Sequence, residues 1–279
     1  MGLALDRRGL RALAGETVHA VVSDSTNADE EGWTGSEGSV VEPLRRVLSG
    51  RPGRIAVSFF ASNVARLRTL ARLAESLGRH PVLMGRSMDR TVRAARAAGY
   101  LEDVPELLST RDYGFLPPER VMLLCTGSQG EPRAALSRLA EDRRRDVYLE
   151  PGDIVVLSAR MIPGNELYVE RLLRLLRDRG VDVVGPDDAP IHVSGHPRRE
   201  ELRTLYGWVR PRAVVPTHGT PAKLEAHAEL AETMGLAAMR CRNGDLVRLA
   251  PGAPMRVDKV VTGRIRRREE DPRRRRGRR

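Results

Sequence analysis

Aromatic residues, cysteines and long apolar runs are scarce in this sequence. Phe, Trp and Tyr make up 4% of its 279 residues, so any nucleic-acid contact would depend on phosphates and main-chain atoms more than on stacked rings. Cys125 and Cys241 form no C-x-x-C pair and no disulfide framework, which is typical of a reducing compartment. No run approaches the roughly 18 apolar residues that cross a bilayer. We therefore expect a cytoplasmic protein that makes no membrane contact.

Positive charge is concentrated at one end of the chain. The formal net charge is +11, and residues 264–279 contribute +7 of it, from ten arginines against three acidic residues, which leaves +4 elsewhere. A segment of this composition cannot bury apolar surface, so we predict a disordered arginine-rich tail over residues 263–279. The tail could bind a polyanion in a salt-dependent way, or it could serve only to keep the chain in solution.

Three of the six histidines lie in two short segments, residues 191–196 and 215–219. Each is an apolar run that ends in small or polar residues and a histidine, the pattern of a strand that carries an imidazole to the edge of a sheet. A segment with helical spacing separates them, so we predict strand, helix and strand, with both imidazoles at one sheet edge. For a single histidine, a strand-end side chain bonded to the backbone is the alternative, but the concentration of three favours a functional site.

A carboxylate is predicted at the end of another strand. Residues 18–22 read as a buried strand that runs directly into Ser23, Asp24, Ser25, Thr26 and Asn27. The hydroxyl and amide groups around Asp24 could orient its carboxylate. The alternative is a helix N-cap or an Asx-turn, which is the commoner role of such clusters.

Strand and helix patterns alternate between residues 52 and 187. The predicted strands are 55–61, 80–84, 121–125, 154–158 and 181–184, and the helices between them are 63–77, 88–98, 132–140 and 166–179. This alternation indicates a parallel α/β sheet with helices on its faces. Residues 1–51 and 188–262 would then complete a second domain, into which residues 52–187 are inserted.

Polar loops follow three strands of the predicted sheet, at residues 58–63, 126–132 and 161–166. Their glycines would let main-chain amides approach a ligand, and a helix N-terminus favours an anion, so a phosphate cradle is chemically reasonable. It is not a P-loop, because the Gly-Lys-Ser/Thr ending is absent. Any one of these loops could be ordinary helix-start chemistry, but three at one sheet edge favour a binding site.

Seven motifs occur in the order found in ribonuclease J, and the chain resembles that family from about residue 16 to about residue 262. The motifs are Ser23-Asp24-Ser25-Thr26-Asn27, Phe60-Ala61-Ser62-Asn63, Gly85-Arg86-Ser87-Met88, Thr126-Gly127-Ser128-Gln129-Gly130-Glu131-Pro132, Ile162-Pro163-Gly164-Asn165-Glu166, His192-Val193-Ser194-Gly195-His196 and Pro216-Thr217-His218-Gly219. The resemblance implies the β-CASP branch of the metallo-β-lactamase fold. Residues 1–51 and 188–262 would form the C-terminal half of the metallo-β-lactamase sheet, and 52–187 the inserted β-CASP domain.

The resemblance also implies an activity and a set of roles. The family hydrolyses RNA phosphodiesters with two zinc ions, as an endonuclease and as a 5′-to-3′ exonuclease that favours a 5′-monophosphate. Carried over motif by motif, His218 would ligate a zinc ion, while Asp24 would orient His196, which contacts the scissile phosphate and protonates the leaving oxygen. A carboxylate raises an imidazole pKa and selects its tautomer, so this is sound acid chemistry. The residues implied to hold RNA phosphates are Ser62, Asn63, His192, Val193, Ser194, Gly195 and His196.

The sequence also departs from the family pattern. The H-x-H-x-D-H metal-binding signature and the later histidine and aspartate ligands are absent, so His218 is the single expected zinc ligand that is present. Thr220 stands where the family usually has glutamate. A zinc site needs three or four ligands, so we expect this chain alone not to assemble the centre that activates water.

Three interpretations therefore remain. The first is the C-terminal portion of a ribonuclease J, whose activity belongs to the complete enzyme. The second is a non-catalytic RNA-binding module. The third, a nucleotide-binding Rossmann-like protein, is disfavoured because no G-x-G-x-x-G follows the first strand. Half a metallo-β-lactamase sheet would leave strand edges unpaired, so we expect a homo-oligomer or a missing N-terminal half as partner, besides RNA.

Overall fold

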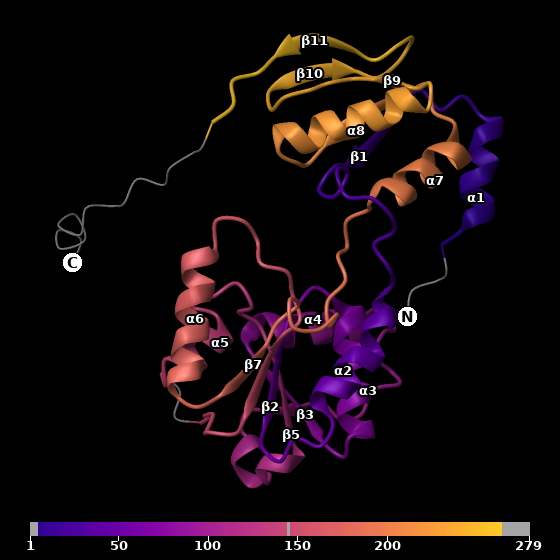
Figure 1. Ribbon diagram of the computed structural model, residues 1–279. Coiled ribbons are helices and arrows are strands. Elements are labelled where there is room, and N and C mark those ends of the chain that lie inside the picture. Colours follow the sequence, from indigo (N-terminus) through magenta and orange to yellow (C-terminus); the bar gives the residue numbers. More distant parts are fainter. Residues whose placement is uncertain (1–4, 144–145, 264–279) are drawn as a thin grey trace, which may run out of the picture. The chain divides into compact units, whose positions relative to one another are not determined.

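The computed structural model describes residues 5–143 and 146–263, and the predicted tail lies outside them apart from Gly263. These residues form two compact units (Figure 1). We call residues 34–195 the central unit and residues 5–33 with 196–263 the histidine unit. Within the described parts of the chain, no helix is both long and apolar enough to cross a membrane.

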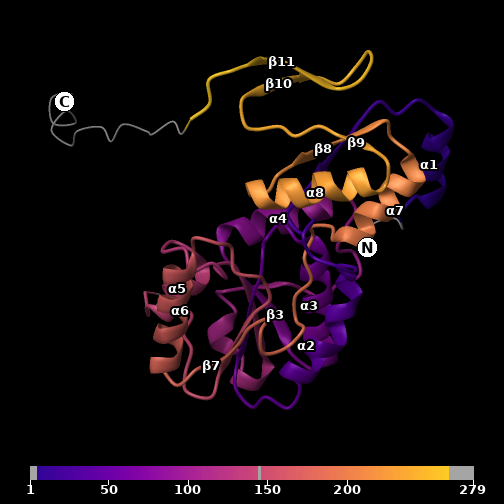
Figure 2. The ribbon, with the colours of Figure 1, turned by 45° about the horizontal axis from the view of Figure 1, so that its top comes forward.

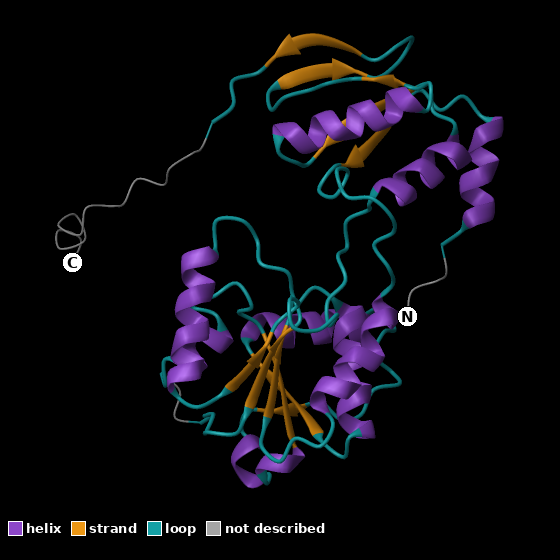
Figure 3. Cartoon of the chain, in the orientation of Figure 1, coloured by secondary structure: helices purple, strands orange, loops and turns teal. Residues whose placement is uncertain are grey.

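The central unit contains a six-stranded parallel sheet with strand order β4-β3-β5-β2-β6-β7 (Figure 3). Its strands are β2 (Ile55–Ser58), β3 (His80–Met84), β4 (Leu108–Ser109), β5 (Val121–Cys125), β6 (Ile154–Leu157) and β7 (Asp182–Val184). Apart from β4, which is only two residues long and was not predicted, each strand corresponds to a predicted one. The parallel α/β prediction is therefore confirmed.

Helices cover both faces of this sheet (Figures 1 and 2). α2 (Val41–Leu48), α3 (Val64–Ser76) and α4 (Arg86–Ala97) pack into one apolar cluster, and α5 (Ala135–Ala140) and α6 (Glu166–Asp178) into another. Successive side chains of a strand point to opposite faces of the sheet and join different clusters. In β2, Ile55 packs in the first cluster and Ala56 in the second. A strand that is buried on both faces needs an unbroken apolar run, and for this reason these strands could be predicted from the sequence.

The histidine unit is built on a three-stranded parallel sheet of order β1-β8-β9. Its elements are β1 (Val21–Asp24), β8 (Ala213–Thr217), β9 (Ala237–Ala238), α1 (Arg7–Ala12), α7 (Arg199–Val209), α8 (Pro221–Thr233) and an antiparallel hairpin of β10 (Asp245–Arg248) and β11 (Met255–Lys259). Leu202, Tyr206, Val214 and Leu230 form much of its core. Short 3-10 helices in the two units are Leu13–Gly15, Glu37–Val40, Tyr113–Phe115 and Pro118–Arg120.

Two details of the sequence prediction are wrong. The strand predicted at residues 191–196 is a loop, because the carbonyl of Ile191 accepts hydrogen bonds from the side chains of Arg66 (3.2 Å) and Ser158 (2.7 Å) rather than from a neighbouring strand. The strand predicted as buried at residues 18–22 begins at Val21 and is only partly buried, with Val22 53% exposed. Among the described strands, β1 pairs with β8 alone, so its other edge is unpaired.

Candidate active site

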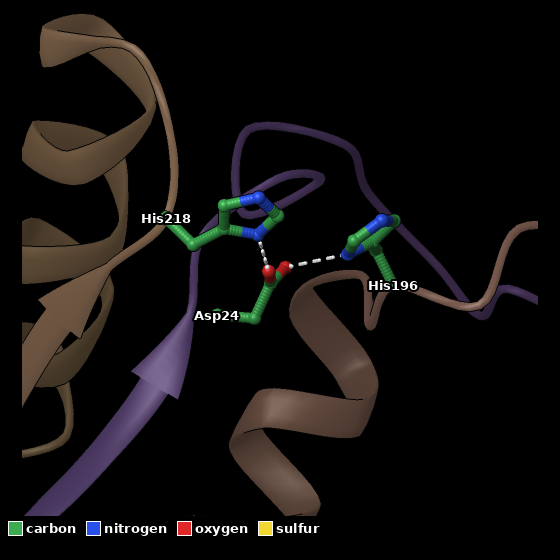
Figure 4. A group of neighbouring side chains, drawn as sticks. All are labelled: Asp24, His196 and His218. Atoms are coloured by element: carbon green, nitrogen blue, oxygen red, sulfur yellow. Dashed lines mark hydrogen bonds and ion pairs between the residues drawn. The ribbon is translucent and has the colours of Figure 1, made fainter. Parts of the chain in front are cut away.

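Asp24, His196 and His218 come together in the histidine unit (Figure 4). Asp24 is the last residue of β1, and His218 follows the last residue of β8. Parallel pairing of the two strands sets Asp24 opposite Thr217, and the amide of Ser25 donates to the carbonyl of Thr217 at 2.9 Å. The two strands therefore end together, and this common end brings the carboxylate to the imidazole of His218.

The carboxylate of Asp24 lies between the two imidazoles (Figure 4). Its Oδ1 is 3.1 Å from Nδ1 of His196, and its Oδ2 is hydrogen-bonded to Nδ1 of His218. Thr26 donates from its backbone amide to Oδ1 at 2.9 Å and from its hydroxyl to Oδ2 at 3.1 Å. The side chain of Asn27 donates to the carbonyl of His196 at 3.1 Å. Each imidazole thus has a neighbour that sets its orientation.

Exposure falls from the histidines to the carboxylate. The side chain of His218 is 70% exposed, that of His196 42% and that of Asp24 24%. Burial acts to raise the pKa of Asp24, but the hydrogen bonds from His218 and Thr26 outweigh it and hold that pKa below its usual range. The carboxylate is therefore ionised near neutral pH and can orient both rings.

The backbone of His218 adopts a conformation that few side-chain-bearing residues adopt. Its φ is 53°, in the left-handed region. The carbonyl of the same residue accepts a hydrogen bond from the hydroxyl of Thr26 at 3.3 Å, which helps to hold this turn. Strain of this kind is found at functional sites more often than elsewhere, since the surrounding structure must maintain it.

The donor chemistry of this cluster fits a metal ion such as zinc. One donor atom from each of the three residues lies within 4.8 Å of the others, and two imidazole nitrogens with a carboxylate oxygen form a common set of zinc ligands. In Figure 4, the second ring nitrogen of each imidazole is directed away from Asp24. A metal could bind all three residues, or it could bind His218 through that nitrogen while Asp24 holds the ring.

A buried polar network lies against the strand that carries Asp24. Ser25 Oγ is 2.8 Å from Nδ1 of His227, Ser23 Oγ is 2.6 Å from the hydroxyl of Tyr206, and that hydroxyl contacts Nε2 of His227. His227 is fully buried. Burial lowers the pKa of His227 to about 4 and raises the pKa of Tyr206 to about 12, so both groups are neutral at physiological pH.

This network was not predicted from the sequence. Tyr206 lies 183 positions from Ser23 and 21 from His227, and His227 sits in α8 beside buried alanines and a leucine, where it reads as an ordinary core residue. The available signal was the alternation of Ser23, Asp24 and Ser25 at the end of β1, which sends the serines to the side opposite Asp24. The serines therefore link the position of Asp24 to a rigid, fully buried group.

The other predicted RNA-binding residues, Ser62, Asn63 and His192 to Gly195, belong to the central unit. Asn63 caps α3, where its side chain accepts a hydrogen bond from the amide of Arg66 at 2.9 Å and donates to Glu37 at 2.8 Å. Ser62 is exposed beside it. The helix-start role that the sequence left open for Asn63 is thus observed.

Arg66 is a second residue that the sequence analysis missed. It is fully buried, pairs with Glu37 at 2.8 Å and donates to the carbonyl of Ile191. Nη2 of Arg66 and Nδ1 of His192 are buried and have no hydrogen-bond partner among the described residues. Burial lowers the pKa of His192, and the charge of Arg66 lowers it further. A buried guanidinium donor without a partner is rare and marks a position where a polar ligand can bind.

Two family models match the chain. Residues 52–176 match the model described as "Ribonuclease J, beta-CASP domain", and residues 189–241 match the "Zn-dependent metallo-hydrolase RNA specificity domain". The first match extends from β2 to near the end of α6 in the central unit, and the second includes His192, His196 and His218.

Individual relatives give the same result. A Ribonuclease J of Sinorhizobium meliloti is 43% identical over 95% of this chain and 47% of its own length, and one of Mycolicibacterium smegmatis is 39% identical over 95% of this chain and 50% of its own length. A solved structure of a protein of unknown function from Enterococcus faecalis V583 is similar in fold, with a TM-score of 0.53 at 17% identity over 91% of this chain and 55% of its own. The chain spans about half the length of the relatives it matches.

Proposed function

Because the chain belongs to the ribonuclease J family of β-CASP proteins, we propose that it contributes to metal-dependent hydrolysis of RNA phosphodiesters, supplying the RNA-binding surface, a general acid and one zinc ligand. The observation that carries the proposal is the placement of one ionised carboxylate, Asp24, against Nδ1 of both His196 and His218. The outer nitrogen of each ring is directed away from Asp24 (Figure 4), and we assign that of His218 to a metal ion and that of His196 to a phosphate.

Each residue has a distinct part in this proposal. His218 binds zinc through its outer nitrogen while Asp24 fixes the ring. His196 contacts the scissile phosphate and donates a proton to the leaving oxygen, and Asp24 orients its ring for this transfer. Zinc, when bound, supplies Lewis-acid activation of the phosphate and of the attacking water. A second zinc ion needs more ligands than this cluster contains, so they come from a segment outside the described residues or from a partner.

RNA binding is proposed for the central unit as well. Ser62, Asn63, His192, Val193, Ser194 and Gly195 contact RNA phosphates, and the unpartnered Nη2 donor of Arg66 supports an anion at this position. A terminal phosphate there would account for a preference for 5′-monophosphorylated RNA. Exonuclease and endonuclease action are both compatible with such a site.

Assembly, domain division and location complete the proposal. The unpaired edge of β1 and the exposed side chain of Val22 support association with a second copy or with a separate N-terminal half. Sedimentation equilibrium tests this association, and a monodisperse monomer with no partner would contradict it.

We also propose a domain division at residues 52 and 187. A cytoplasmic location is part of the proposal too, and it is consistent with the free thiols of Cys125 and Cys241.

One observation favours the alternative of a non-catalytic RNA-binding module. Among the described residues, the cluster of Asp24, His196 and His218 is the one group of His, Cys, Asp and Glu with metal-binding spacing. Such a set is too small for the two-metal centre implied by the family. In this alternative, the chain binds RNA but never hydrolyses it.

The test measures degradation of a 5′-monophosphorylated RNA with zinc or manganese. The chain is assayed alone and mixed with the half of the Sinorhizobium meliloti relative that it does not match. We expect no turnover alone and turnover in the mixture that is lost with His218→Ala or His196→Ala. Salt-sensitive RNA binding without turnover in the mixture would favour the non-catalytic module. Absence of RNA binding altogether would overturn both functions.

A further inference from the structure

A large open cavity of about 1110 Å³ lies within the central unit, at the carboxyl ends of three strands. Its walls come from the loop after β2, the loop and first turns of α4 after β3, and the loop and start of α5 after β5. All of the lining residues belong to the central unit. The residues of the Asp24 cluster belong to the histidine unit, and none of them lines the cavity.

The chain topology explains why a cavity forms there. β5 lies between β3 and β2 in the sheet. The helices after β2 and β3 pack on one face, while α5, which follows β5, packs on the other. Connections that leave neighbouring strand ends toward opposite faces open a crevice at the carboxyl edge, and ligands of open parallel α/β sheets bind in such crevices.

Five arginines line the cavity: Arg86, Arg90, Arg93, Arg133 and Arg138. None of the five has an ion-pair or side-chain hydrogen-bond partner among the residues that the structure describes. Other arginines of the central unit are of both kinds. Some pair with carboxylates, namely Arg45, Arg51, Arg54, Arg66, Arg68, Arg72, Arg143, Arg171 and Arg179, and others, such as Arg46 and Arg96, have no ion pair among the described residues; the cavity is distinguished by holding five unpaired arginines together. Asp89 and Glu131 also line the cavity, so a clear excess of unpaired positive charge remains. Unpaired charge of one sign in a crevice attracts an anion.

Neutral groups in the same cavity suit a nucleotide. Ser87 in the first turn of α4 and the side chains of Thr126 and Ser128 offer hydroxyls near an N-terminal helix end, which favours phosphate. Gly127 allows the tight turn, because a Cβ there would lie 2.8 Å from that of Ala134. Phe60, 40% exposed, gives the wall an aromatic surface against which a base can stack.

We propose that this cavity is a nucleotide-phosphate subsite in which the arginines of α4 and α5 hold phosphates and Phe60 stacks on a base. The ligand is a stretch of single-stranded RNA, and in this respect the inference rests on the proposed function. Of the residues already proposed to contact RNA phosphates, Ser62 lines this cavity, whereas Asn63 and residues 192–196 do not; Arg66 does not line it either. A free nucleotide offers the same chemistry, so the experiment separates the two sources.

The test compares two double variants of the whole chain with equal loss of charge. Arg90→Gln/Arg93→Gln removes two cavity arginines of α4. Arg46→Gln/Arg96→Gln removes two exposed arginines outside the cavity, one of them on the same helix. Fluorescence anisotropy measures binding of a labelled single-stranded RNA and of labelled adenosine 5′-monophosphate over a range of salt concentrations. Circular dichroism checks that both variants fold.

We expect the cavity variant to lower the salt slope of RNA binding by about 1.4, as for two lost phosphate contacts, and the control to leave the slope unchanged. Weakened binding of RNA with unchanged binding of the mononucleotide identifies the RNA chain as the ligand. Weakened binding of the mononucleotide also supports the subsite and identifies a free nucleotide as its ligand. Equal behaviour of the two variants toward both probes overturns the subsite. If the unmodified chain fails to bind RNA, the proposed function falls, while the mononucleotide arm still decides the subsite.

Discussion

Asp24 and His218 are joined where β1 and β8 end, by a hydrogen bond between the carboxylate and Nδ1 of the imidazole. The two residues are 194 positions apart in the chain. The same carboxylate lies 3.1 Å from Nδ1 of His196. A single acidic residue therefore orients two histidines that come from different loops, and loss of its charge should disturb both.

Asp24→Asn should weaken metal binding. The amide keeps the shape of the side chain but has no charge and cannot accept from both imidazoles, so His218 loses its fixed orientation. We expect zinc affinity to fall about 10- to 100-fold, measured by competition with a chromophoric chelator. Asp29→Asn is the matched control, because Asp29 is an exposed carboxylate of the same unit that pairs with Lys223. Equal zinc affinity in the two variants would show that Asp24 does not support the metal site.

Acid should destabilise the histidine unit through His227. Burial lowers its folded pKa to about 4 from 6.5, so between these values the unfolded state binds more protons than the folded state. Stability is then fully present above pH 6.5 and declines as the pH falls toward about 4, by up to about 3 kcal/mol. Urea unfolding across this range measures the decline.

His227→Gln serves as the test variant for that pH dependence. Glutamine does not titrate but retains a donor and an acceptor for Ser25 and Tyr206. We expect the variant to be less stable at neutral pH and to show a flatter dependence between pH 6.5 and about 4. His80→Gln in the central unit is the control. A slope in His227→Gln equal to that of the parent would remove His227 as its cause.

Arg66→Gln should destabilise the central unit far more than the equivalent change at Arg68. Both arginines lie on α3, but Arg66 is buried against Glu37 and the carbonyl of Ile191, whereas Arg68 forms a partly exposed pair with Asp103. We expect a loss of about 3 kcal/mol for Arg66→Gln and less than about 1 kcal/mol for Arg68→Gln. Chemical denaturation followed by circular dichroism gives both values. Similar losses would mean that the buried contacts of Arg66 contribute little.

Gly127→Ala should strain the loop after β5. Gly127 has a φ of 112°, and a Cβ there would lie 2.8 Å from the Cβ of Ala134. We expect a loss of about 1–3 kcal/mol, seen as a lower midpoint of thermal unfolding. Gly114→Ala is the control, since nothing lies within 4 Å of its added Cβ and its φ is not positive. A midpoint unchanged in Gly127→Ala would indicate that the loop adapts without cost.

The regular parts of the central unit could be predicted because their information is local. β3 and β5 have the predicted bounds, residues 80–84 and 121–125, since a strand buried on both faces is a continuous apolar run. The strand predicted at residues 191–196 fails for the opposite reason. The apolar residues there are buried, but the carbonyl of Ile191 accepts a hydrogen bond from the side chain of Arg66, 125 positions away. No local sequence pattern predicts that hydrogen bond. The domain boundaries and the roles of the site residues stay predictions.

The sequence by itself determined the family, the parallel α/β architecture and the identity of the polar residues at the strand ends. The order of the motifs and the spacing of the apolar residues are properties of the linear chain, so they can be recognised before the fold is known. Only the tertiary structure decided that Asp24 faces both histidines, that His227 is buried against Ser25, 202 positions away, and that five arginines surround one crevice. These relationships depend on which strand pairs with which and on the face to which each helix returns. Strand pairing and helix packing bring together residues that are far apart in the sequence. The interaction energies of these residues therefore contribute only in the folded chain, and no local sequence pattern indicates them.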